Sequence, residues 1–252
     1  MHILRCLLFS CLMLTCPWIA TKMTQGFRLA KLQVHLPAHT KWDAPAPESL
    51  SEILDQPFHF LGKGMQSFVF ASEDGRYVIK FFRFDKQQDK TQYTHLFDAC
   101  TMAYHQLRVE TGLIYIHLNP TQGLPLIHCK DPLGRSTHIA LDPLRFVIQR
   151  RGEEFEKTLL EARTDPAKMK QRLDQWFALI QARASLGIWN QDSNLTRNFG
   201  FLEDRAIELD FGNYHTEGAN APSTEIERCR QKMRLWLSKN APEWIPYLNS
   251  TH

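Results

Sequence analysis

The chain has 252 residues, 43% of them hydrophobic and 23% charged, which is the composition of a folded globular protein rather than a disordered or fibrous one. Thirty Lys and Arg against 27 Asp and Glu leave a formal charge of only +3, which excludes a broad electrostatic attraction to nucleic acid. The six cysteines provide neither a disulfide framework nor a metal-binding spacing, because three lie in the first apolar stretch and the other three are far apart.

An uncharged apolar run at residues 6–20 follows Arg5 at the N-terminus. It predicts a signal peptide or a short membrane anchor over residues 1–21, and a buried N-terminal helix is the third alternative. Ala20 suits a cleavage site but Trp18, two residues earlier, does not, so cleavage stays open. For an uncleaved anchor, the basic residues after the run favour a cytoplasmic body, whereas cleavage would export the protein.

The rest of the chain divides into three parts. Residues 22–50 contain Ala-Pro-Ala-Pro at 44–47 and predict a linker. Residues 51–152 predict a strand-rich lobe with one helix, and residues 153–252 predict a mostly helical lobe. The expected fold class is therefore α+β, in two lobes.

The first lobe is predicted to open with a hairpin, because β-forming residues on both sides flank Asp74-Gly75, a pair typical of a tight turn. A helix at about 89–110 should follow and end at Gly112. Its apolar stripe consists of Leu96, Cys100, Ala103 and Leu107. Further strands are predicted at residues 112–119, 124–130, 135–141 and 145–150.

The second lobe is predicted to begin at Asp165-Pro166, an N-cap followed by proline at the first helical position. Gly187 should end this helix. A later helix near 224–238 is predicted to start at a capping box formed by Thr224 and Glu227. Two tryptophans, Trp176 and Trp236, are expected in the core.

Three segments are candidates for chemistry. Gly62, Gly64 and Ser67 lie at the first turn of the predicted hairpin, where small residues let backbone amides approach a phosphate. On its own, a plain glycine-rich turn explains them equally well.

Lys80 is the second candidate, because it lies within the apolar strand YVIKFF. An ammonium group in such a strand is costly unless an anion lies nearby. The period of two in a strand places Val78 on the same face, and Val69 on the neighbouring strand is expected to join them.

The third candidate is a polar loop after the long helix, which contains Asp192 and Asn198 and is followed by Asp210 in Asp-Phe-Gly. Carboxylate and amide oxygens that converge there would suit Mg²⁺.

Together and in this order, the three segments resemble the nucleotide site of the protein-kinase-like superfamily, over about residues 57–214. The resemblance implies a bilobal kinase-like fold with a reduced helical C-lobe. It also implies ATP- and Mg²⁺-dependent transfer of a phosphoryl group to a hydroxyl acceptor. The short stretch after Gly212 leaves no room for peptide-binding helices, so the chain is more similar to small-molecule or lipopolysaccharide-core kinases than to full-length protein kinases.

The resemblance also implies residue roles. Asp192 would accept the proton of the substrate hydroxyl, and Lys80 would contact the α- and β-phosphates of ATP. Asn198 and Asp210 would hold Mg²⁺. The remaining nucleotide contacts would come from Gly62, Gly64, Ser67, Val69, Val78 and, at the hinge beside adenine, Gln149.

Some positions depart from the family pattern. Asn190-Gln191-Asp192 replaces His-Arg-Asp, and Asn198 lies six residues after Asp192 rather than five, so Asn194 is an alternative metal ligand. The carboxylate partner of Lys80 could be Asp98 or Glu110. A pseudokinase that binds nucleotide or a protein partner, and that acts as a secreted effector if exported, is therefore the alternative interpretation.

Overall fold

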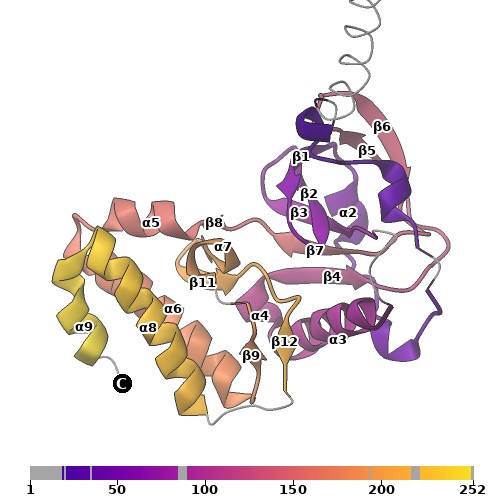
Figure 1. Ribbon diagram of the computed structural model, residues 1–252. Coiled ribbons are helices and arrows are strands. Elements are labelled where there is room, and N and C mark those ends of the chain that lie inside the picture. The colour runs from indigo at the N-terminus through magenta and orange to yellow at the C-terminus, as the bar shows by residue number, and fades with distance from the viewer. Residues whose placement is uncertain are drawn as a thin grey trace, which may run out of the picture. The chain divides into compact units, whose positions relative to one another are not determined.

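The computed structural model describes residues 19, 21–34, 36–84, 90–192, 194–216 and 222–250 (Figure 1). Strands and helices follow one another in runs along the chain, and most strand pairs are antiparallel, so the expected α+β class is confirmed. Contacts divide the chain into two compact units, Met1–Gln88 with His117–Ile148, and Asp89–Ile116 with Gln149–His252. Within the described residues, no helix is long and apolar enough to cross a membrane. The apolar run at 6–20 lies outside the described residues, except for Ile19.

The first unit is built on strands. Its elements are η1 (Leu29–Leu32), η2 (Thr40–Trp42), α2 (Leu50–Leu54), β1 (Phe58–Lys63), β2 (Ser67–Ser72), β3 (Tyr77–Phe82), β5 (Leu126–Lys130), β6 (Ser136–Ala140) and most of β7 (Phe146–Arg150). These strands follow one another in the sheet in the order β7-β3-β2-β1-β5-β6. β1, β2 and β3 pair antiparallel, β1 runs parallel to β5, and β5 pairs antiparallel with β6.

The predicted hairpin is confirmed as β2 and β3, joined through Asp74-Gly75. Gly75 has a φ of 71°, a conformation that glycine adopts without steric cost. The carboxylate of Asp74 accepts hydrogen bonds from the Arg76 amide at 2.9 Å and from the Ser72 hydroxyl at 2.6 Å, which fixes the turn.

Residues 22–50, expected as a linker, contribute to the core of the first unit. Phe27, Leu32 and Trp42 are all buried. The Phe27 ring lies 5.2 Å from the ring of Phe68 and 5.4 Å from that of Phe70, measured between centroids. This segment therefore packs on the first unit through its apolar side chains and is not a free spacer.

The second unit is mostly helical. Its elements are α3 (Lys90–Gln106), α4 (Arg108–Thr111), β4 (Leu113–His117), β8 (Glu153–Glu154), α5 (Phe155–Ala162), α6 (Pro166–Ser185), β9 (Trp189–Asn190), α7 (Leu195–Asn198), β10 (Phe199–Leu202), β11 (Arg205–Glu208), β12 (Tyr214–His215), α8 (Pro222–Asn240), η3 (Pro242–Trp244) and α9 (Ile245–Ser250). α6 and α8 pack side by side (Figure 1), and their apolar faces form the core together with Phe155 and Phe201. Trp176 and Trp236 are buried there, as predicted.

The predicted helix at 89–110 is present as α3 and α4, and the stripe of Leu96, Cys100, Ala103 and Leu107 is buried. Gly112 ends α4 with a φ of 62°, as expected. By its contacts this helix belongs with the later residues of the second unit, not with the strand-rich unit in which the sequence placed it.

The start of α6 is also as predicted. The Asp165 carboxylate accepts hydrogen bonds from the amides of Ala167 and Lys168, and Pro166 occupies the first helical turn. The predicted start of α8 at Thr224 is wrong, because the helix begins at Pro222. Proline at a first helical position has the φ that a helix needs, so it starts the helix two residues earlier.

We expect Asp165→Ala to lower the free energy of unfolding by about 0.5–2 kcal/mol, since two amides at the start of α6 lose their acceptor. Asp165→Asn keeps an acceptor of the same shape and should stay within a few tenths of a kcal/mol of the parent. Urea unfolding followed by circular dichroism measures both, and equal losses in the two variants would contradict the capping role.

Candidate functional site

Two loops of the second unit lie next to each other and carry Asp192 and Asp210. β9 leads into Asp192, and β11 leads into Asp210. β9 then pairs antiparallel with β12, which brings Asn190 opposite Tyr214. The loop before the β10–β11 hairpin and the loop after it are therefore held together by a short sheet.

The side chain of Asn190 connects these loops. Its Oδ1 accepts a hydrogen bond from the Asp192 amide at 2.9 Å, and its Nδ2 donates to the Asp210 carbonyl at 2.8 Å. The same Nδ2 donates to Glu208 Oε1 at 2.8 Å. One buried amide thus fixes the backbone at both aspartates and ties it to the interior of the unit.

Asn198 adds a second connection. Its carbonyl accepts hydrogen bonds from the amides of Leu209 at 2.6 Å and Asp210 at 3.4 Å, and its Nδ2 donates to the Asp192 carbonyl at 3.5 Å. Because Nδ2 faces that carbonyl, Oδ1 is the atom of Asn198 that could bind a cation. Asp192, Asn198 and Asp210, which the sequence singled out separately, are brought together within the second unit.

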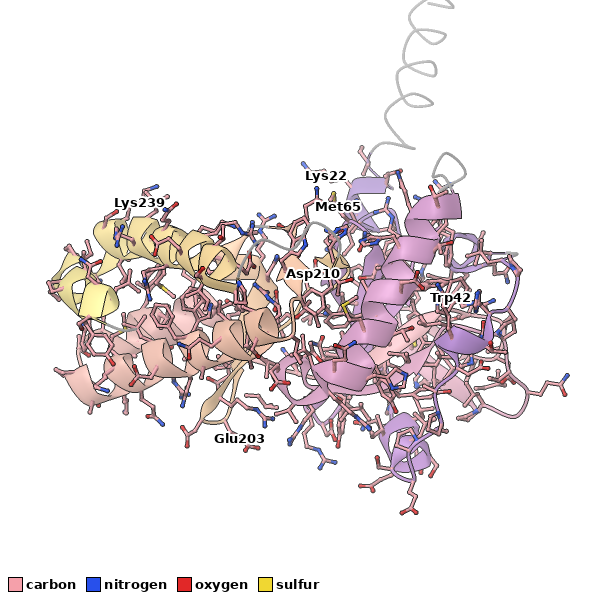
Figure 2. The ribbon with its side chains drawn as sticks, turned by 90° about the horizontal axis from the view of Figure 1, so that it is seen from below. Lys22, Trp42, Met65, Glu203, Asp210 and Lys239 are labelled. Atoms are coloured by element: carbon pink, nitrogen blue, oxygen red, sulfur yellow. The ribbon has the colours of Figure 1, made fainter. Side chains whose placement is uncertain are left out.

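The exposure of the three side chains differs. Asn198 is buried and Asp192 is half-buried. Asp210, which is labelled in Figure 2, is exposed. The alternative ligand Asn194 accepts a hydrogen bond from the Arg197 amide at 3.1 Å and so caps α7. The described residues contain no group of three or more His, Cys, Asp or Glu side chains placed to hold a metal ion. Binding of Mg²⁺ here would therefore depend on Asp210, on the amide oxygen of Asn198 and on oxygens that a ligand brings.

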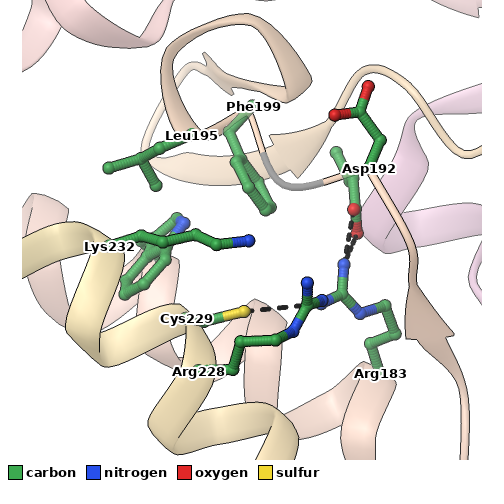
Figure 3. A pocket seen from close by; sticks show the side chains of 9 residues that line it. Arg183, Asp192, Leu195, Phe199, Arg228, Cys229 and Lys232 are labelled. Atoms are coloured by element: carbon green, nitrogen blue, oxygen red, sulfur yellow. Dashed lines mark hydrogen bonds and ion pairs between the residues drawn. The ribbon is translucent and has the colours of Figure 1, made fainter.

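A buried ion cluster lies beneath the two loops (Figure 3). Arg183 of α6 donates to both oxygens of Glu208 on β11 and, at 2.5 Å, to Glu225 on α8. Tyr214 donates to Glu208 Oε2 at 2.6 Å. The side chains of Arg183 and Glu208 are each only 1% exposed, so neither could stay charged without the other.

Arg228 joins the cluster to the loop that carries Asp192. It donates to Glu225 Oε2 at 2.7 Å through Nε, and to the Asn190 carbonyl at 2.6 Å through Nη2. Burial opposes the ionised form of Glu225, but the hydrogen bond from Arg228 and the charge of Arg183 outweigh it and lower the pKa of this carboxyl group. Burial likewise opposes the charge of Arg183, and the attraction of Glu208 outweighs it and raises the pKa of the guanidinium.

The sequence analysis did not identify this cluster, although one signal for it was present. Arg183 lies three residues after Ile180 and seven after Trp176, so it falls on the apolar stripe of α6. A cation at such a position needs a buried anion. Its partners, Glu208 and Glu225, lie far away in the sequence, so the pattern alone could not name them.

The phosphate-loop candidates lie in the first unit. Residues 64–66 form the turn between β1 and β2, where the Gly64 amide donates to the Ser67 carbonyl at 2.8 Å. A Cβ added at Gly62 would meet no atom within 4 Å, and one added at Gly64 would lie 3.7 Å from Ser67 Oγ. Neither glycine has a positive φ. These glycines therefore leave space beside the backbone instead of relieving strain.

Lys80 lies in the middle of β3 and is half-buried. Val69 lies directly opposite it in the β2–β3 register, so the two share a face, and the alternation along β3 adds Val78 to that face as predicted. Asp98 and Glu110, the two candidate carboxylate partners of Lys80, belong to α3 and α4 of the second unit. The pairing of Lys80 with either stays a prediction.

The side chain of Gln149 forms buried hydrogen bonds within the second unit. The amide nitrogen donates to the carbonyls of Thr111 at 2.6 Å and Glu208 at 3.2 Å, and the residue is fully buried. Its side chain therefore braces the second unit. Any contact of this position with adenine would come from its backbone.

Comparison of the chain with the models of known protein families gives no match. None of the curated proteins matches it either.

We expect Arg183→Met to destabilise the protein by about 3–5 kcal/mol, because the buried carboxylate of Glu208 loses its cation and Glu225 keeps only Arg228. Arg163→Met removes an exposed arginine and should change the free energy of unfolding by about 0.5 kcal/mol or less. Adding Glu208→Gln to Arg183→Met should recover part of the loss, since one unpaired charge disappears. Chemical unfolding of the four proteins tests this, and a loss below 1 kcal/mol in Arg183→Met would contradict it.

Proposed function

We propose that the protein is a phosphotransferase with a bilobal kinase-like fold, which uses ATP and Mg²⁺ to phosphorylate a hydroxyl group on an acceptor. The main support is the Asn190 side chain, which holds the Asp192 loop and the Asp210 loop together through hydrogen bonds of 2.8–2.9 Å. A catalytic carboxylate and a metal-binding carboxylate must lie on adjacent rigid loops for in-line transfer, since this reaction depends mainly on positioning and charge neutralisation.

In the proposed reaction, the acceptor hydroxyl oxygen attacks the γ-phosphorus of ATP, and the bond from that phosphorus to the β–γ bridging oxygen breaks, releasing ADP. The Asp192 carboxylate accepts the proton that the hydroxyl loses. Asp210 and Asn198 Oδ1 would bind Mg²⁺, which neutralises charge on the phosphate oxygens. The acceptor is a small molecule, a glycan or a protein.

The nucleotide contacts proposed for the first unit rest on Lys80 and on the turn between β1 and β2. Lys80 would contact the α- and β-phosphates, and the turn would offer backbone amides to the phosphates. Two properties support this assignment: the empty space beside Gly62, and the shared face of Lys80, Val69 and Val78. Residues 1–21 would tether the protein to a membrane or direct its export.

A pseudokinase is the second candidate function, and two observations favour it. Asn198 is buried, and its Nδ2 is directed at the Asp192 carbonyl, which limits how freely the side chain can turn towards a metal. Asn190 and Gln191 also stand where protein kinases carry His and Arg. In this case the fold would bind nucleotide or a protein partner without transferring phosphate.

We expect Mg²⁺-ATP to raise the melting temperature of the full chain by about 2–4 °C at ten times its dissociation constant. Lys80→Met and Asp210→Asn should abolish the shift, because each removes a charge that faces the triphosphate or its metal. Lys130→Met and Asp204→Asn are matched controls outside the proposed site and should retain it. Absence of a shift in the parent protein would rule out nucleotide binding, and with it the phosphotransferase, and would leave only a pseudokinase that binds a protein partner.

Asp192→Asn separates the two candidate functions. If the protein transfers phosphate, this variant should keep the Mg²⁺-ATP shift but lose about 10²–10⁴-fold in the rate of transfer, because the proton acceptor is gone. Release of ADP in the presence of candidate alcohols and sugars provides the rate, with Asp204→Asn as the control. Equal rates in the parent and Asp192→Asn, at background level, would favour the pseudokinase.

A further inference from the structure

A small pocket of about 10 Å³ lies between the Asp192 loop, α6 and α8 (Figure 3). Its lining residues are Trp176, Arg183, Asp192, Leu195, Phe199, Glu208, Arg228, Cys229 and Lys232. A space of this size holds one oxygen atom. Asp192, Arg228 and Lys232 are only half-buried, so the pocket reaches the surface at these residues.

Two residues that line this space each carry a buried hydrogen-bond donor without a partner among the described residues. Trp176 is fully buried and Arg183 is 1% exposed, yet the indole Nε1 of the first and the Nε of the second have no hydrogen-bond partner within the described part of the chain. An unpartnered buried donor costs about 1–3 kcal/mol, so two of them along one pocket indicate an acceptor that belongs there.

The carboxylates that line the pocket do not accept hydrogen bonds from these two donors. Both oxygens of Glu208 already accept from Arg183, and they also accept from Asn190 and Tyr214. The Asp192 carboxylate accepts from the Asn194 amide at 3.1 Å, and Figure 3 shows it directed away from the pocket. The missing acceptor must therefore come from a ligand or from solvent.

The position of the Lys232 ammonium group favours an anion over water. Arg183 and Arg228 are matched by Glu208 and Glu225, whereas Lys232 has no ion pair with any described residue. Its ammonium group points into the pocket (Figure 3), one helical turn after Arg228 on α8. Burial, and then the charge of Arg228, lower the pKa of Lys232. An anion bound beside Lys232 would stabilise its charged form against both the burial and the charge of Arg228, whereas a neutral water molecule would not.

We infer that this pocket binds an oxyanion, a phosphate or carboxylate group, with one oxygen inside and the others at the Lys232 ammonium. Asp192 lines the same pocket. If the proposed phosphotransferase function holds, on which this step rests, the oxyanion is part of the acceptor. The acceptor is then an anionic alcohol, such as a phosphorylated or carboxylated sugar, whose oxyanion is anchored in the pocket at the loop that carries Asp192 and whose hydroxyl extends out of the pocket towards the Asp192 carboxylate.

Inorganic phosphate is the probe, added without nucleotide to the full chain at constant ionic strength. At ten times its dissociation constant it should raise the melting temperature by about 2–4 °C. The rise should vanish in Lys232→Met. It should persist in Lys239→Met, which removes an exposed lysine of the same helix, in Lys80→Met, and at least in part in Lys232→Arg.

Three results would overturn the oxyanion site: no rise in the parent protein, equal rises in Lys232→Met and Lys239→Met, or an equal rise with chloride. A second measurement tests whether the oxyanion belongs to the acceptor. The rises in melting temperature caused by phosphate and by Mg²⁺-ATP add only when the oxyanion pocket and the nucleotide site are distinct. Loss of the phosphate shift under saturating Mg²⁺-ATP would place the pocket in the nucleotide site and overturn the assignment of the oxyanion to the acceptor. A phosphate shift without any Mg²⁺-ATP shift would leave the oxyanion site standing and reject the proposed function.

Discussion

The buried pairing of Arg183 with Glu208 is the interaction on which the second unit depends. It joins α6 to β11, and through Glu225 and Tyr214 it also reaches α8 and β12. Removing two charges from water costs several kcal/mol per ion, which is recovered only when the geometry is good and the remaining donors and acceptors are satisfied. Both oxygens of Glu208 accept hydrogen bonds from Arg183, and Asn190, which donates to Glu208, also bonds to the backbone of both aspartate loops. The two loops are therefore supported by a buried and charged cluster.

Local signals in the sequence predicted much of the fold. Asp165-Pro166 located the start of α6, because an N-cap acts on amides two and three residues away and needs no tertiary information. The prolines of Ala-Pro-Ala-Pro at 44–47 indicated a linker over residues 22–50. The burial of Phe27, Leu32 and Trp42 in this segment could not be predicted, because their spacing follows neither the helical nor the strand period. The prediction placed the start of α8 at the capping box of Thr224. The helix instead begins at Pro222, because the φ of proline is already the one that a first helical residue needs.

For the candidate site, the order of the motifs located Asp192, Asn198 and Asp210, since a short hairpin between two loops brings its ends together. The ion cluster was not predictable from spacing. Arg183 and Glu225 are 42 residues apart, and they meet only because α6 packs against α8. The two aspartate loops lie wholly within the second unit, and the glycine turn and Lys80 lie in the first.

Neither unit is continuous in the chain, and this affects the order of events during synthesis. Asp89–Ile116 leaves the ribosome before His117–Ile148, yet it packs with residues from Gln149 onward. The first unit has all its strands once β7 is made, while Asp89–Ile116 still lacks the later residues of its own unit. At synthesis rates of about 5–20 residues per second, those later residues take roughly 5–20 seconds to follow. The strand-rich unit is therefore complete in the nascent chain well before the unit that carries the two aspartate loops.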